Sequence, residues 1–176
     1  MLEGKNVVLR QLKISDWEKS LQWRNNLAIK QMAMMHSFPV TEFVEREWYE
    51  SVMKSKSDRT IYFTVTTEDD NPIGFVSLTN INYQNRNCYL GIVIGETKNQ
   101  GKGFGRESIE LLIQYAFNTL NLIKISLEVV EKNFAAIKLY KSLGFVEEGK
   151  LKKHHYCNGD FLDVIVFSLF KETEEP

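Results

Sequence analysis

The chain is poor in cysteine. Only Cys88 and Cys157 occur among its 176 residues, and they are far apart. Disulfide-based secreted domains and zinc sites both need several cysteines at short spacings. We therefore predict free thiols in a reducing compartment, with neither a disulfide nor a metal site. His154 and His155 are adjacent, and neighbouring strand residues point to opposite faces, so one ion would not bind both.

Net charge and long apolar runs are also absent. Lysine and arginine number 22 against 23 acidic residues, a net charge of −1, which gives nucleic acid or an anionic membrane no general attraction. No apolar run approaches the ~20 residues of a spanning helix, and residues 1–5 do not resemble a signal peptide. We predict a cytoplasmic protein with a single domain over residues 1–171 and an acidic tail at 172–176.

Hydrophobic patterning predicts the secondary structure. Apolar runs indicate strands at residues 7–10, 61–65, 73–78, 88–94, 123–130 and 161–170. Helical spacing indicates helices that begin near Ser15, Thr41, Arg106 and Asn133, the first at a Ser-x-x-Glu capping box and the last ending at Gly144. The second would place Val44, Trp48 and Val52 on one face. An antiparallel meander followed by a β–α–β–α unit and a closing strand predicts a mixed α/β or α+β domain.

The segment Asn-Gln-Gly-Lys-Gly-Phe-Gly-Arg at residues 99–106 is the most informative of the chain. Its alternate glycines leave the backbone uncovered where a helix begins. Unpaired N–H groups and the positive end of the helix dipole favour a phosphate at such a place. The segment therefore predicts a site for a phosphate-bearing cofactor, with a simple chain-reversing turn as the alternative.

A dinucleotide-binding turn is a second alternative, in which Glu128 on the next strand would bind the ribose. Its glycines follow the strand directly in a G-x-G-x-x-G pattern. Here the pattern is G-x-G-x-G, and residues 95–99 separate it from the strand. The pyrophosphate of an acyl-CoA fits the segment better.

Two stretches resemble the signatures of the GCN5-related N-acetyltransferases (GNAT). Residues 100–105 resemble the Gln/Arg-x-x-Gly-x-Gly/Ala signature, and residues 127–145, with Asn133 and Tyr140, resemble the second one. The resemblance covers essentially the whole chain. It is greatest to the branch of ribosomal-protein N-terminal, polyamine and amino-sugar acetyltransferases, the last through Trp23-Arg24-Asn25. It implies the GNAT fold, a mixed, largely antiparallel sheet of six or seven strands with about four helices.

The resemblance also implies a binding site for acetyl-CoA as co-substrate. The loop would bind the pyrophosphate, and the preceding strand, splayed from the next one, would pair with the pantetheine arm and polarise the thioester carbonyl with a backbone N–H. Lys102 and Arg106 add positive charge unless they are solvated surface, and Asn133 is a co-substrate contact or only a helix cap. The residues implied are Val93, Ile94, Gly95, Gln100, Gly101, Lys102, Gly103, Phe104, Gly105, Arg106 and Asn133.

Two catalytic residues follow from the same resemblance. Tyr140 matches the general acid that protonates the leaving thiolate, although its place on an apolar helix stripe would also suit a core tyrosine. Glu128 matches a catalytic base, and burial in an apolar strand would raise its pKa. The alternatives for Glu128 are an exposed carboxylate and a water chain that serves as base.

The implied reaction moves an acetyl group to a primary amine by direct attack in a ternary complex, since neither cysteine lies in an acyl-carrying motif. We expect a protein N-terminus or a nucleotide-linked amino sugar as acceptor, with a polyamine or a non-catalytic CoA-binding module as alternatives. Glu42, Glu45, Glu47 and Glu50 would serve a polyamine unless they form a solvated face. Trp23, Arg24, His36 and Phe38 would line the acceptor site, while Trp17 and Trp48 would pack between helices. A homodimer is compatible with the family.

Overall fold

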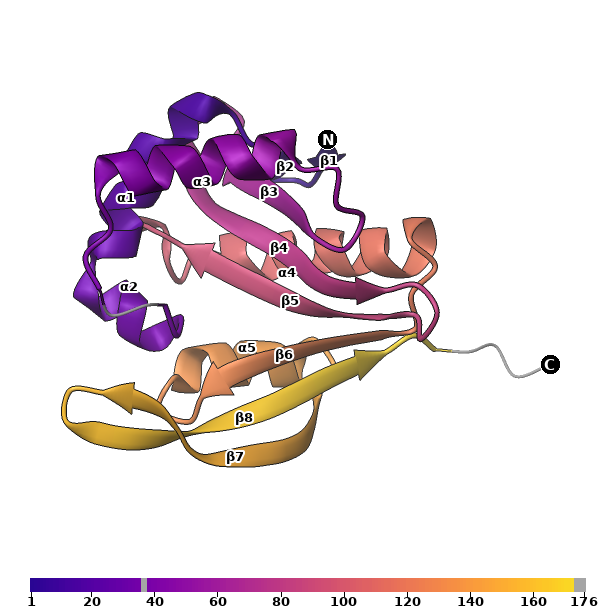
Figure 1. Ribbon diagram of the computed structural model, residues 1–176. Coiled ribbons are helices and arrows are strands. Elements are labelled where there is room, and N and C mark those ends of the chain that lie inside the picture. The colour runs from indigo at the N-terminus through magenta and orange to yellow at the C-terminus, as the bar shows by residue number, and fades with distance from the viewer. Residues whose placement is uncertain (36–37, 173–176) are drawn as a thin grey trace.

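An eight-stranded sheet forms the centre of the molecule (Figure 1). The computed structural model describes residues 1–35 and 38–172. The strand order is β1-β2-β3-β4-β5-β6-β8-β7, and of the strand pairs in these ranges only β5 and β6 are parallel. The strands are β1 (Leu2–Glu3), β2 (Val8–Arg10), β3 (Ile61–Thr66), β4 (Pro72–Asn82), β5 (Asn87–Ile94), β6 (Lys124–Val130), β7 (Val146–Cys157) and β8 (Asp160–Phe170).

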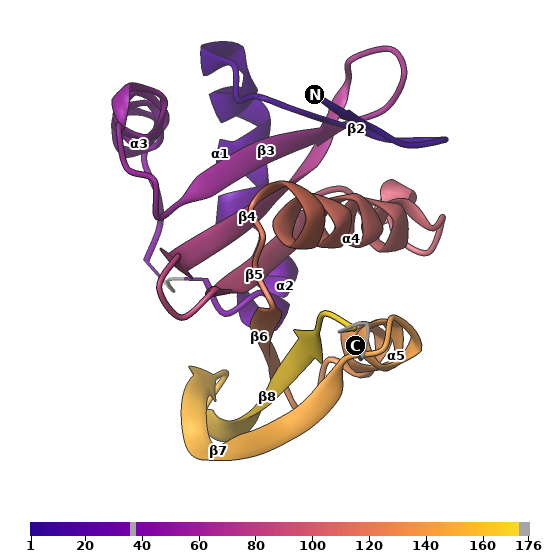
Figure 2. The same ribbon diagram turned by 90° about the vertical axis from the view of Figure 1, so that its right-hand side faces the viewer.

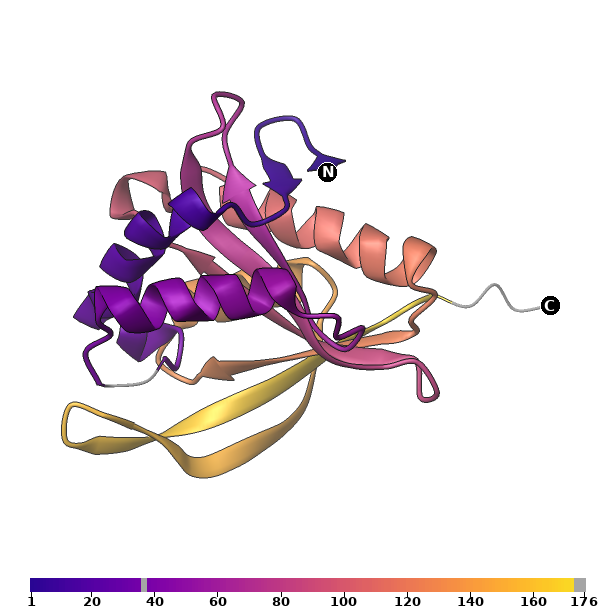
Figure 3. The same cartoon turned by 45° about the horizontal axis from the view of Figure 1, so that its top comes forward.

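Helices cover both faces of this sheet. Figure 2 shows α1 and α3 on one face and α4 and α5 on the other. The helices are α1 (Trp17–Asn25), α2 (Leu27–Met32), α3 (Glu42–Lys54), α4 (Phe104–Gln114) and α5 (Phe134–Ser142). Short 3₁₀ turns lie at Ile14–Asp16 and Thr97–Asn99, and α4 continues into a π-helical turn at Tyr115–Thr119. The long α3 crosses the sheet above β3 and β4 (Figure 3).

The predicted mixed α/β fold is confirmed, with more elements than expected. Eight strands and five α-helices replace six or seven strands and about four helices in the described part of the chain. The missed β1 has two residues and α2 has six, too few for either to show a period. The missed β7 is exposed along most of its length, so it lacks the apolar alternation of a half-buried strand.

Three helix ends were predicted correctly from local sequence signals, and one was predicted wrongly. Thr41 caps α3 by accepting the Val44 N–H at 3.3 Å, Asn133 caps α5, and Gly144 follows α5 with φ of +88°. The predicted box at Ser15 does not form. Asp16 instead accepts the Lys13 N–H at 2.9 Å, and α1 begins at Trp17.

The buried face of α3 also differs from the prediction. Val44 is half exposed, and Glu45 and Tyr49 are buried in its place. The helix therefore presents a carboxylate to the interior, which an apolar pattern alone would place at the surface.

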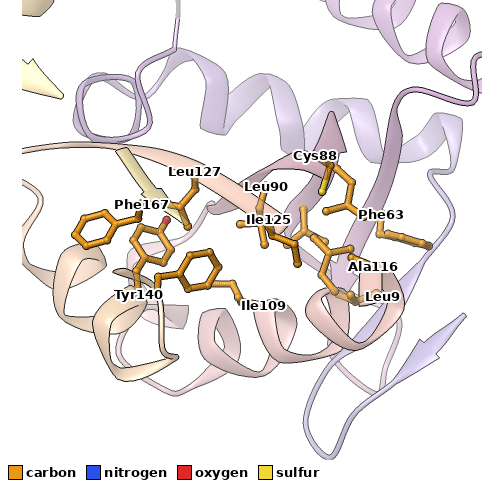
Figure 4. Packing of buried hydrophobic residues seen from close by; sticks show 14 of the residues in the cluster. Leu9, Phe63, Cys88, Leu90, Ile109, Ala116, Ile125, Leu127, Tyr140 and Phe167 are labelled. Carbon is orange, nitrogen blue, oxygen red and sulfur yellow. The ribbon is translucent and has the colours of Figure 1, made fainter. Parts of the chain in front are cut away.

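One continuous core joins the two halves of the sheet (Figure 4). Leu9, Phe63 and Leu90 pack towards α4, around Ile109 and Ala116. Further along the sheet, the core continues through side chains of β6, β8 and α5, namely Leu127, Phe167 and Tyr140. Each buried Leu, Ile or Phe contributes about 1.5–3 kcal/mol, so this cluster fixes the two halves relative to each other.

The sheet opens between β5 and β6. These strands pair only at Asn87–Lys124, Cys88–Ile125 and Tyr89–Ser126. Beyond that point β5 stays paired with β4 as far as Ile94, and β6 stays paired with β8 as far as Val130. The two strands therefore diverge (Figure 1), as the resemblance to the GNAT family implied.

Candidate active site

The diverging end of β5 presents backbone groups to the opening. The Gly95 N–H donates to the Ile73 carbonyl of β4 at 2.8 Å. Because hydrogen-bonding direction alternates along an antiparallel strand, the N–H and C=O groups of Ile92 and Ile94 point away from β4. Of the three strand residues in the predicted co-substrate site, Ile94 thus faces the opening with its backbone, whereas Val93 and Gly95 are directed to β4.

The glycine loop next to this strand forms a cradle of N–H groups. Helix α4 begins at Phe104, and its first backbone bond runs from the Glu107 N–H to the Gly103 carbonyl at 3.0 Å. The amides of residues 104–106 therefore point out of the helix start. Gly101 and Gly103 have φ of +73° and +88°, and a Cβ on either would meet no atom within 4 Å. Such an open cradle fits the oxygens of a pyrophosphate.

The other loop residues have separate contacts. Gln100 donates from Nε2 to the Ile94 carbonyl at 3.2 Å, which holds the loop against β5. Arg106 pairs with Glu110 at 3.0 Å and also bonds to Ser142, so it joins α4 to α5. Lys102 is exposed and takes part in no ion pair within residues 1–35 and 38–172. Of the two positively charged loop residues, Lys102 is therefore the one whose charge is less neutralised by a carboxylate.

Asn133 has contacts on both sides of the opening. Its Oδ1 accepts the Ala136 N–H at 3.2 Å, and its Nδ2 donates to the Met32 carbonyl of α2 at 3.3 Å. Gln31 of α2 also donates to Asn158 in the β7–β8 turn, at 2.8 Å. Helix α2 thus links the N-terminal half of the sheet to the C-terminal half at the wide end of the opening.

Tyr140 is a core residue of α5. Its side chain is only 7% exposed and packs on Phe145 with ring centroids 5.9 Å apart. The hydroxyl oxygen points towards Leu127 of β6 (Figure 4). Burial raises the pKa of this phenol to about 12, so the hydroxyl keeps its proton at neutral pH.

Glu128 lies on the opposite face of β6. Its neighbours Leu127 and Val129 are buried in the core on the α5 side, and Glu128 itself is exposed. The expectation that the apolar strand buries this carboxylate is therefore wrong, because alternation along the strand turns it outward. Tyr140 and Glu128 are thus on different faces of the sheet.

A cavity of about 310 Å³ lies on the face that α1 and α3 cover. It reaches Ile92 and Val93 of β5, beside the opening, and its walls include Arg24, Trp48, Tyr62 and Phe75. Arg24, one of the residues that we expected in the acceptor site, is among its lining residues. Trp48 also lines it, although we expected only helix packing for this residue.

Two other residues that we expected in the acceptor site, Trp23 and Phe38, do not line this cavity. Trp23 is buried with its ring against Gly95, where an added Cβ would come within 2.0 Å of the indole. Phe38 is 80% exposed and does not line the cavity. His36 lies outside the described residues.

The four glutamates of α3 divide into two groups. Glu45 is fully buried and accepts hydrogen bonds from Ser20 Oγ at 2.6 Å and Arg24 Nη1 at 2.8 Å. Glu42, Glu47 and Glu50 lie in a separate surface hollow on α3. None of the four lines the cavity.

Sequence reasoning missed the strand residues of the cavity. Tyr62 of β3 and Phe75 and Ser77 of β4 line it, together with Ser20 of α1. A serine in an otherwise apolar strand is a usable signal for a polar cavity, but the partner strands of a sheet cannot be read from one sequence.

Cys88 and Cys157 are free thiols, and Cys88 is buried. Burial raises the pKa of the Cys88 thiol to about 12, which makes it a poor nucleophile. Within the described ranges, no group of three or more His, Cys, Asp or Glu side chains is placed to hold a metal ion. None of the helices described there is long and apolar enough to cross a membrane.

Comparison with known proteins connects this geometry to one family. Residues 6–146 match the family described as the acetyltransferase (GNAT) domain. The spermidine N(1)-acetyltransferase of Vibrio cholerae is 37% identical over 147 residues, which cover 82% of this chain and 83% of that protein. The enzyme of the same name from Escherichia coli is 31% identical over 172 residues, 97% of this chain and 89% of that one.

A solved structure agrees with these sequence matches. The crystal structure of spermidine N-acetyltransferase from Vibrio cholerae in complex with CoA and spermine has a TM-score of 0.86 and 32% identity, over 93% of this chain and 95% of that chain. These matches favour a catalytic acetyltransferase over the non-catalytic CoA-binding module that we kept as an alternative. The chain belongs to the GNAT family and is an acetyl-CoA-dependent N-acetyltransferase.

Proposed function

We propose that the acceptor is a polyamine, acetylated on a terminal primary amine. The observation that carries this proposal is the cavity beside the open end of β5, with Trp48, Tyr62 and Phe75 in its walls. Aromatic faces suit contact with the methylene chain of a polyamine. The two spermidine N(1)-acetyltransferases among the relatives favour this acceptor over the protein N-terminus and the nucleotide-linked amino sugar that we expected first.

The two substrates would approach from opposite faces of the sheet. The pyrophosphate of acetyl-CoA would bind the loop amides of residues 101–106, and the arm would pair with the edge of β5 at Ile92 and Ile94. The acceptor would occupy the cavity on the α1 and α3 face. Acetyl-CoA supplies the acetyl group as a thioester, and the amine forms a C–N bond to it as the C–S bond breaks.

Two side chains would move the protons of this exchange. Tyr140 would donate its phenolic proton to the leaving sulfur, from the α5 side. Glu128 would accept the proton of the attacking ammonium, directly or through water, from the other side. The backbone N–H groups of β5 would stabilise charge on the carbonyl oxygen, which is the largest contribution in many acyl transfers.

An acceptor screen tests the proposal. Purified protein with saturating acetyl-CoA is offered spermidine, spermine, peptides with free N-termini and nucleotide-linked amino sugars, and thiol release is followed. We expect kcat/KM for spermidine to exceed that for the other two classes by about tenfold or more. A larger kcat/KM for a peptide or a sugar would replace the polyamine as acceptor and leave the acetyltransferase activity in place.

A further inference from the structure

Among the described residues, the lining of the acceptor cavity includes a cation and no carboxylate. Arg24 is the one charged residue in its lining within the part of the chain that the structure describes. Polyamines are themselves cations, so this arrangement does not serve simple charge attraction. The position of the guanidinium needs another explanation.

The position of Arg24 is fixed from two directions. Its Nη1 donates to Glu45 Oε2 at 2.8 Å, and its guanidinium carbon lies 5.6 Å from the centre of the Trp48 ring. Glu45 has no exposed side-chain surface, whereas that of Arg24 is 24% exposed. The ion pair therefore points its positive end into the cavity and its negative end into the protein.

The other titratable groups around the cavity do not cancel the positive charge that Arg24 presents to it. Burial raises the pKa of Tyr62 on β3, while Arg24 lowers it, so the charge of Arg24 reaches the phenol in the cavity wall. Tyr49 lies behind Ser20 with a pKa of about 12, caused by burial, and the Arg10–Asp16 pair lies near it. Lys30 of α2 donates to the Phe38 carbonyl outside the lining, and Glu128 is on the far side of the opening.

We propose that Arg24 promotes loss of a proton from the bound acceptor, because its positive charge disfavours an ammonium group in the same cavity. An alkylammonium has a pKa near ~10, so less than about 1% of it is neutral at pH 7. A neighbouring cation lowers such a pKa, which increases the neutral and nucleophilic fraction. The proton leaves to Glu128 or water before the C–N bond forms. The inference rests on the proposed function, since it places the reacting amine in this cavity.

Two substitutions with opposite effects test it. The pH dependence of kcat for spermidine is measured at saturating acetyl-CoA for the unmodified protein, Arg24→Gln and Glu45→Gln. Arg24→Gln removes the cation, so the acidic limb of the profile should shift towards higher pH by about one pH unit. Glu45→Gln removes the carboxylate that neutralises Arg24, so the acidic limb should shift towards lower pH by a similar amount.

The Michaelis constant separates this role from ordinary binding. At pH 7, Arg24→Gln should lower kcat about tenfold and also lower KM for spermidine, because the cationic substrate is no longer repelled. If Arg24 instead only helps to bind the acceptor, its removal raises KM and leaves the pH profile in place. That result overturns the proposal.

Controls separate the proposal from unfolding and from a wrong acceptor. Arg46→Gln removes an exposed arginine of α3 outside the cavity and should not shift the profile. Arg24→Lys keeps the charge and should keep the profile, and the double change Arg24→Gln with Glu45→Gln leaves no unpaired buried charge and should fall between the single variants. If spermidine is not acetylated, the proposed function fails, and the profiles are recorded with whichever primary amine the screen identifies. The inference is contradicted, with either acceptor, if the pH profiles of Arg24→Gln and Glu45→Gln shift in the same direction or do not shift at all.

Discussion

At the scale of single residues, Tyr140 is a core residue, and our proposal also gives it the role of general acid. The apolar stripe of α5 buries its ring, and the same packing directs its hydroxyl to β6 (Figure 4). Burial raises the pKa of the phenol to about 12, so the group keeps its proton throughout the neutral range. The packing of the ring and the retained proton are therefore compatible with one another, and the proposed role uses both.

Tyr140→Phe should lower kcat by about 10²–10⁴-fold, the usual contribution of a positioned acid. KM for acetyl-CoA and the melting temperature should change little, because the ring that packs in the core remains. Thiol-release kinetics and a thermal melt measure both. Tyr115→Phe, the same change in a tyrosine packed on Phe63, is the control and should keep its activity. Equal rates for Tyr140→Phe and the unmodified protein would remove Tyr140 from the mechanism.

Residues whose role depends on their own neighbours in the chain could be predicted. Thr41, Asn133 and Gly144 act through backbone groups three or four residues away, and all three were identified. The Arg24–Glu45 pair could not be predicted, because α1 and α3 are separate in sequence and only their packing brings the charges together. The outward direction of Glu128 could have been predicted, since Leu127 and Val129 flank it in a strand.

At the scale of elements, the start of α4 is the most predictable feature of the site. The glycine spacing predicted an uncovered helix start after a strand, and the positive φ angles of Gly101 and Gly103 are the geometry that this spacing permits. The divergence of β5 from β6 came only from the family resemblance. Strand pairing depends on contacts between distant segments, which a local pattern does not contain.

Gly103→Ala should weaken acetyl-CoA binding. A side chain at φ of +88° costs about 1–2 kcal/mol, and relief of that strain would turn the amides of residues 104–106 away from the cradle. We expect KM for acetyl-CoA to rise about tenfold, with KM for the acceptor unchanged. Gly149→Ala in β7 is the control, because a Cβ there meets no atom within 4 Å and φ is not positive. Unchanged KM in Gly103→Ala would mean that the pyrophosphate binds elsewhere.

At the scale of the whole molecule, we expect stability in acid to depend on the buried ion pair between Arg10 and Asp16. Asp16 is 3% exposed and is held by Arg10 of β2, at 2.8 Å, and by Thr64 of β3, at 2.7 Å. Burial alone would raise the pKa of Asp16, but the hydrogen bonds from Arg10, Lys13 and Thr64 keep it below its ordinary value. Asp16 therefore stabilises the fold above its unfolded pKa, and this stability is lost as the pH falls through its folded pKa.

Asp16→Asn should reduce the free energy of unfolding by about 3 kcal/mol at pH 7, because it breaks a buried pair. It should also make the loss of stability below about pH 4 less steep. Urea unfolding at pH 7 and pH 3 measures both effects. Glu50→Gln, which removes one partner of an exposed pair on α3, should have little effect at either pH. An equally steep acid loss in Asp16→Asn would show that other carboxylates control it.

The separation of β5 from β6 after three residue pairs also bears on the aggregation and the stability of the protein. It gives the sheet two additional strand edges inside the molecule, and an unpaired edge is a template on which another chain can add. An extended ligand arm that pairs with one of these edges closes it. A ligand that binds only the native state also stabilises that state in proportion to its concentration over its dissociation constant. If the arm of acetyl-CoA pairs with β5 as proposed, acetyl-CoA would also stabilise the folded state and cover an edge at which aggregation could begin.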